Sequence, residues 1–213
     1  SINRLGMDNS YEGGESLTVG FDFKKEKIKN ENEIKEIEDF LELKLATIFR
    51  NSNEKNIPTG STLDRKKSNI FGQFNYKPTS NISLNYDFSI NNDLDAIEYN
   101  SINAKIDFDK FSTQFNFLEE TSLINQSNII ENISTYKFDE QNNFSFQTRR
   151  NKKLNLTEYY NLNYEYKNDC LTAGIQYRKN YYNDDDIKPV EELFFTISIV
   201  PLTTFSPDKM ALN

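Results

Sequence analysis

The stretch ISLNYDFSIN at residues 82–91 alternates apolar and polar side chains at every position. Ile82, Leu84, Tyr86, Phe88 and Ile90 are separated by serine, asparagine and aspartate. An α-helix repeats about every 3.6 residues and does not separate the two kinds of residue in this way, whereas the side chains of a β-strand alternate between two faces. The stretch therefore predicts a strand with one apolar and one polar face.

The same alternation recurs along the chain, for example at residues 17–23 and 160–167. It comes in blocks of about ten residues, which is typical of strands that cross a membrane in a β-barrel. We expect about twelve strands, at residues 2–8, 15–27, 39–50, 68–77, 81–92, 96–108, 111–122, 129–138, 143–150, 157–168, 170–182 and 192–201. The sequence predicts an all-β chain, an antiparallel transmembrane β-barrel at residues 1–201, with an irregular C-terminal tail at residues 202–213.

The connections between the expected strands alternate in length. Residues 78–81, 109–110, 139–142 and 168–169 are short and rich in turn-forming residues, whereas residues 51–67, 123–128, 151–156 and 183–191 are mostly longer. Outer-membrane barrels have short periplasmic turns and long outer loops, which predicts the orientation of the chain. Two connections fit less well, the short one at 92–95 and a long one at 29–38, where we expect one helical turn at 33–38.

The composition restricts the class of protein. The chain of 213 residues is 36% hydrophobic and 27% charged, which is polar for a well-buried core, yet its 14% aromatic residues argue against disorder. A barrel with a wet interior and a lipid-facing exterior reconciles these values. The net charge of −8 argues against a nucleic-acid partner.

Few residues are candidates for chemistry. Histidine is absent, which removes its nucleophilic, acid–base and zinc-binding roles. The acidic run Asp184-Asp185-Asp186 lacks the ligand spacing of a calcium loop and indicates a solvated loop. We therefore expect no catalytic residue, no metal site, no cofactor and no enzymatic activity.

The chain has no apolar run long enough for a transmembrane helix, and its first residues have no apolar signal-peptide core. Because it also lacks a starting methionine, we expect it to be part of a longer precursor with an upstream export signal.

Three segments of the last third resemble the C-terminal end of the LPS-assembly protein family (LptD), the lipopolysaccharide translocons of the Gram-negative outer membrane. They are Tyr159–Tyr177, Asp184–Pro189 and the strand Leu193–Ile199. Residues 3–8 with 12–20 are similar to a segment in the middle of that family's barrel, and residues 84–87 with 94–100 resemble it more loosely.

The resemblance implies a function and a set of partners. The chain would supply about twelve strands, the C-terminal half, of a larger barrel of about twenty-six strands, and would insert lipopolysaccharide (LPS) into the outer leaflet through a lateral gate. The implied partners are LPS, an LptE-like plug lipoprotein, the N-terminal jellyroll domain with the periplasmic LPS bridge, and outer-membrane lipid.

The resemblance also implies roles for particular residues. Family members form a disulfide from the Cys170 turn to the N-terminal domain, although a free thiol in a turn is the simpler interpretation. The lateral-gate strand would comprise Phe195, Thr196, Ile197, Ser198 and Ile199 and end at Pro201, which cannot donate a ladder hydrogen bond. The basic cluster Arg149, Arg150, Lys152 and Lys153 is a candidate contact for LPS phosphates, or else a solvated loop whose cations reach toward headgroups.

Two alternative functions remain open from the residues themselves. A general outer-membrane porin, or another barrel, would show the same strand pattern. A soluble β-rich interaction protein would also alternate, with less uniform strands and with polar residues only on the outside. An outer-membrane enzyme is disfavoured because histidine is absent.

Overall fold

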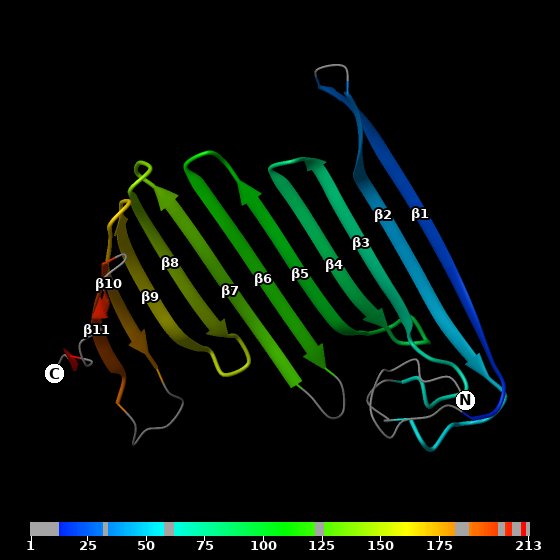
Figure 1. Ribbon diagram of the computed structural model, residues 1–213. Coiled ribbons are helices and arrows are strands. Elements are labelled where there is room, and N and C mark those ends of the chain that lie inside the picture. The colour runs from blue at the N-terminus through cyan, green and yellow to red at the C-terminus, as the bar shows by residue number, and fades with distance from the viewer. Residues whose placement is uncertain are drawn as a thin grey trace. The chain divides into compact units, whose positions relative to one another are not determined.

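The computed structural model describes residues 13–31, 34–57, 62–121, 126–181, 188–199, 203–205 and 210–211. Every regular element in these residues is a β-strand (Figure 1). None of the described residues belongs to a helix of the length and apolarity that a membrane span requires. The expected strand at 2–8, the acidic run Asp184–Asp186 and Pro201 lie outside the described residues.

The long strands follow the alternating blocks of the sequence, and turn-forming residues separate them. They are β1 (Ser16–Glu31), β2 (Ile34–Arg50), β3 (Ile70–Thr79), β4 (Ile82–Ile90), β5 (Ile97–Asp107), β6 (Phe111–Thr121), β7 (Gln126–Lys137), β8 (Asn142–Asn151), β9 (Leu156–Lys167), β10 (Leu171–Asn180) and β11 (Val190–Ile199). Two short strands follow, β12 (Thr203–Phe205) and β13 (Met210–Ala211).

The strands pair in the order of the sequence, from β1 to β12, and β13 also pairs with β11. Neighbours in β1–β4 and in β7–β11 are antiparallel. An all-β, antiparallel fold, as the sequence predicts, is confirmed. Two compact units divide the chain: Ser1–Ile102 with Leu118–Ser127, and Asn103–Phe117 with Asn128–Asn213.

The hairpin of β1 and β2 differs from the expectation. In place of a long connection with a helical turn at 33–38, β1 continues to Glu31 and β2 begins at Ile34, and the backbone pairs these two residues. The predicted helical turn is wrong because cross-strand pairing overrides the helical propensity of its Glu and Lys residues. Figure 1 shows this hairpin extending past the β3–β4 turn. The connection is therefore short, like the other turns at every second position along the chain.

The C-terminal residues also differ from the expectation of an irregular tail. The backbone pairs Ile199 with Thr203 and Ile197 with Phe205 in β12, and Leu193 with Met210 in β13. Both short strands run antiparallel along the same edge of β11. An edge strand exposes unpaired N–H and C=O groups, and the C-terminal residues supply partners for them. We expected the block at 192–201 to be the last strand, but the sheet continues beyond it.

In the first unit the register sorts side chains into one apolar and one polar face. One cross-strand row runs through Phe21, Leu45, Gly72 and Phe88, and the adjacent row runs through Asp22, Lys44, Gln73 and Asp87. The apolar side chains of β1 are exposed, with Leu17, Phe21 and Phe23 64%, 55% and 45% accessible, whereas Leu45 and Phe88 are half-buried. Among the described residues, only Ile48 and Ile57 are buried hydrophobic side chains.

The second unit repeats this arrangement over β8–β11. Phe144, Tyr164, Ile175 and Phe195 form an apolar row across the four strands. Polar side chains face the other way, including Gln147, Asn161, Arg178 and Glu192 in one row. Tyr164, Ile175 and Phe195 are each more than a third exposed. The apolar face of this unit is therefore accessible, as a surface that contacts lipid would be.

Candidate functional site

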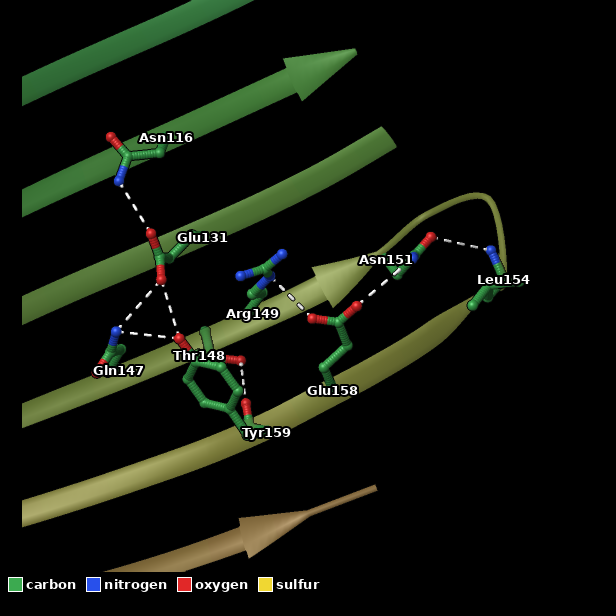
Figure 2. Close-up of polar contacts among 9 residues, drawn as sticks. All are labelled: Asn116, Glu131, Gln147, Thr148, Arg149, Asn151, Leu154, Glu158 and Tyr159. Carbon is green, nitrogen blue, oxygen red and sulfur yellow. Dashed lines mark hydrogen bonds and ion pairs between the residues drawn. The ribbon is translucent and has the colours of Figure 1, made fainter. Parts of the chain in front are cut away.

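A hydrogen-bonded cluster occupies the polar face of the second unit, centred on Glu131 of β7 (Figure 2). The carboxylate of Glu131 accepts hydrogen bonds from the Tyr159 hydroxyl at 2.9 Å, from Asn116 Nδ2 at 3.1 Å and from Gln147 Nε2 at 3.2 Å. Gln147 also donates to the Tyr159 hydroxyl at 3.0 Å. Three neutral donors from β6, β8 and β9 thus hold one half-buried carboxylate in place.

A β-bulge extends this cluster toward the β8–β9 connection. The pairing of β8 with β9 shifts between Arg149, which lies opposite Tyr159, and Arg150, which lies opposite Thr157. Glu158 is the additional residue, and its carboxylate forms a 2.8 Å ion pair with Arg149 Nε. In a regular strand Glu158 and Tyr159 would point to opposite faces. The bulge brings both side chains to the polar face, which is a common role of bulges.

The chemistry of the cluster is that of a hydrated polar surface. It presents a carboxylate, a guanidinium, amides and a phenol in fixed positions, with no histidine anywhere in the chain. In the part of the chain that the structure describes, no group of three His, Cys, Asp or Glu residues could hold a metal ion. The residues of the cluster therefore suit the binding of water and polar solutes.

The hydrogen bond from Tyr159 to Glu131 is testable. We expect Tyr159→Phe to lower the free energy of unfolding by about 1.5–3 kcal/mol, the usual contribution of a hydrogen bond to a charged group. Denaturant unfolding of the folded protein in detergent measures the change. Tyr160→Phe is the matched control, because Tyr160 lies on the opposite face and its ring packs against Phe146 and Tyr181. An equal loss in both variants would contradict a specific role for the bond.

The predicted basic cluster does not converge on one point. Arg149 is paired with Glu158 on the polar face, whereas the neighbouring Arg150 donates from Nη2 to Asn155 Oδ1 at 2.6 Å. Lys152 lies 5.8 Å from the centre of the Phe117 ring. Lys152 and Lys153 are both exposed in the connection between β8 and β9. The structure gives Arg149 a carboxylate partner that sequence reasoning did not foresee.

Cys170 lies in the tight turn between β9 and β10, as the sequence predicts. The Asn168 side chain accepts hydrogen bonds from the backbone N–H groups of Cys170 and Leu171, at 3.0 and 2.8 Å. The backbone N–H of Asn168 closes the turn by donating to the carbonyl of Leu171 at 2.8 Å. The thiol is free and exposed. It is therefore accessible to a partner outside the described residues.

The predicted gate strand corresponds to β11. Phe195, Ile197 and Ile199 share one face, and Thr196 and Ser198 share the other, because the backbone pairs Phe195 with Ile175 and Thr196 with Gly174 of β10. The outer edge of β11 pairs with β12 and β13. The C-terminal residues thus occupy this edge of β11 at Glu192–Leu193 and at Ile197–Ile199.

Sequence reasoning missed a second polar region, in the first unit. Residues 62–69, which lead into β3, fold against the polar face, where Thr62, Ser68 and Asn69 are buried. Asn69 Nδ2 donates to Ser89 Oγ at 2.9 Å and to Glu98 Oε2 at 2.8 Å. The turn-rich composition of residues 51–67 indicated a loop but contained no signal for this docking, and Ser68 and Asn69, which we expected in the next strand, precede β3.

Comparison with known proteins assigns no family. No protein-family model matches the chain, and no curated protein matches it. Among solved structures, a mutant of the Rhodopseudomonas blastica porin is 10% identical over 92% of this chain and 88% of that chain, with a TM-score of 0.42. A second mutant of that porin is 11% identical over 90% and 87% of the two chains, with a TM-score of 0.38. No statement about function follows from likeness of this degree.

Proposed function

We propose that this chain forms part of an outer-membrane β-barrel whose polar face lines a water-filled channel for small polar solutes. The observation that carries the proposal is the separation of the two faces. In each unit, taken by itself, large apolar side chains lie on one accessible face, those of β1 in the first unit and those of β8–β11 in the second, and the buried residues described in the first unit are mostly polar. A protein in water exposes few such apolar patches.

Backbone pairing supports the same proposal. Only helices and sheets whose strands are fully paired satisfy their N–H and C=O groups in hydrocarbon. Each long strand from β2 to β11 has a partner on both sides. The alternative of a soluble β-rich interaction protein is disfavoured, because such a protein would bury its apolar faces in a core, and the described residues contain only two buried hydrophobic side chains.

Measurement of ion conductance across a lipid bilayer tests this proposal. The full-length protein, folded in detergent and added to a planar lipid bilayer, should produce stepwise increases in ion current. Phase separation in a clouding detergent should place the protein in the detergent phase. A protein that remains in the aqueous phase contradicts the membrane location, and one that inserts without conducting contradicts the open channel.

A second candidate is insertion of LPS into the outer leaflet, as in the family that Tyr159–Tyr177 and Leu193–Ile199 resemble. The exposed thiol of Cys170 in a tight turn favours it, since an unpaired cysteine in an exported protein indicates a partner elsewhere. On this proposal the partners are LPS, an LptE-like plug lipoprotein, the jellyroll domain with the periplasmic bridge, and outer-membrane lipid. Arg149, Arg150, Lys152 and Lys153 would face the LPS phosphates, and the gate would open along the last strands.

Cys170 distinguishes the two candidates. If the chain belongs to an LPS translocon, we expect Cys170 to be oxidised in the full-length protein. A non-reducing gel should then show a mobility shift that Cys170→Ser abolishes, with Ser198→Cys in the same background as a control for non-specific oxidation. Quantitative labelling of Cys170 by a thiol-reactive probe in the assembled protein would contradict the disulfide. The general channel would then be the remaining proposal.

A further inference from the structure

The docked connection between β2 and β3 borders a cavity of about 620 Å³ on the first unit. Thr62, Leu63 and Asn69 form its rim on the loop side, and β2–β5 supply most of the wall. In Figure 1 the coloured part of this connection lies at the C-terminal end of β2 and leads into β3. The volume is within the range of cavities that hold small organic ligands.

The rim is held in place by contacts that do not depend on a ligand. Arg50 is buried and donates from Nε to the Leu63 carbonyl at 2.7 Å. The hydroxyl of Ser68 accepts the backbone N–H of Ile48 at 2.9 Å, and Asn69 reaches Ser89 and Glu98. The cavity therefore has a preformed shape, which reduces the entropy cost of binding.

One rim residue has an unusual backbone conformation. Thr62 has φ of 58°, in the left-handed region that β-branched residues rarely adopt, and it is only 5% exposed. Its hydroxyl accepts the backbone N–H of Asn69 at 3.1 Å. Such conformations persist only where the surroundings enforce them. Thr62 thus positions Asn69, which in turn contacts the Glu98 carboxylate.

The lining combines apolar surface with an excess of negative charge. Leu63 of the loop contributes an apolar group, and Phe71, which lies opposite Ala46 and Ser89, contributes an aromatic ring on the same face as Asp87. The charged lining residues are three half-buried carboxylates, Asp87, Glu98 and Glu120, and one lysine, Lys44. Lys44 forms a 2.6 Å ion pair with Glu42, a residue outside the lining. Since Glu42 already balances the ammonium group, the carboxylates dominate the charge of the cavity.

We propose that this cavity binds small organic cations that carry an aliphatic or aromatic group next to an ammonium. Leu63 and Phe71 match the hydrocarbon part, and the Phe71 ring and the carboxylates both attract the cation. The cavity proposal depends on the proposed channel only because the channel supplies the route by which the solute reaches the cavity. Binding to the cavity is a property of the first unit and is measured without conduction.

Equilibrium binding to the full-length protein in detergent tests the proposal. Isothermal titration with benzyltrimethylammonium chloride should show saturable binding that weakens as sodium chloride increases, since ion screening reduces charge attraction. Benzoate, an anion of similar size, should not bind.

Asp87→Asn and Glu98→Gln should each weaken binding about fivefold, and the glutamine retains an acceptor for Asn69. Asp93→Asn changes the net charge equally in the connection between β4 and β5, away from the cavity lining, and should leave binding unchanged.

Each outcome has a distinct meaning. Absence of saturable cation binding to the unaltered protein overturns the cavity proposal, as does equal binding of benzoate. Unchanged binding in the Asp87→Asn and Glu98→Gln double variant overturns it as well, and if that variant fails to fold, the salt dependence of the unaltered protein decides. A protein that conducts ions but does not bind the cation contradicts only the cavity. One that binds the cation but does not conduct contradicts only the channel.

Discussion

Leu84→Arg should prevent the full-length protein from assembling in the outer membrane. Leu84 lies in β4 opposite Tyr76 of β3, on the same face as Tyr86 and Phe88. If this face contacts lipid, an arginine near the midplane of the bilayer costs about 2–4 kcal/mol. A native domain has a free energy of unfolding of roughly 5–15 kcal/mol, so one such change removes a large part of it. Heat modifiability on a gel, together with protease protection in cells, measures assembly.

Asn85→Arg is the matched control, because it places the same side chain one position further along the same strand. Asn85 lies opposite Asn75, whose amide donates to the Glu42 carboxylate at 2.8 Å. An arginine on this face would stay hydrated and close to an acidic group, so we expect normal assembly. Equal tolerance of the two variants would contradict a lipid-facing apolar side, and equal failure would contradict a wet polar side.

Gly72→Ala should destabilise the folded protein strongly, although it adds a single methyl group. An ideal Cβ on Gly72 would lie 2.0 Å from Cζ of Phe88 and 2.5 Å from two further ring carbons. The Phe88 ring therefore occupies the space that any other side chain at position 72 would need. Overpacking of this kind typically costs about 1–3 kcal/mol. Denaturant unfolding in detergent, followed by intrinsic tyrosine fluorescence, measures the loss.

Gly174→Ala tests whether this loss is specific to position 72. Gly174 lies in β10 opposite Glu165, and an added Cβ would meet the Tyr164 carbonyl oxygen at an ordinary 3.7 Å. Because alanine restricts the unfolded chain, this variant should be stabilised by about 0.4–1 kcal/mol. In a Phe88→Ala background, the Gly72→Ala change should cost much less, because the ring that it meets is gone. Two glycine variants that behave alike would show that the Phe88 ring moves away without cost.

The sequence by itself determined the strands and their faces. Alternation of period two requires an extended chain, and a shift of one residue would exchange every side chain between the faces, so the pattern at residues 82–90 also predicted which face is apolar. Short turns were equally readable, because Asn, Asp and Pro mark them through local backbone preferences. Asn168, which holds the Cys170 turn with its own side chain, is an example of such local chemistry.

Features that depend on partners distant in the sequence were decided only by the tertiary structure. The helical turn expected at 33–38 gave way to a strand because β1 lies alongside it and pairs with it. Glu158 joins Tyr159 on the polar face only because the pairing with β8 shifts by one residue. The loop contacts of Asn69 with Ser89 and Glu98, and the pairing of the C-terminal residues with β11, likewise join segments that no local pattern connects. Local preference sets which residues extend and which turn, whereas register, bulges and loop docking depend on hydrogen bonds that exist only once the strands have come together.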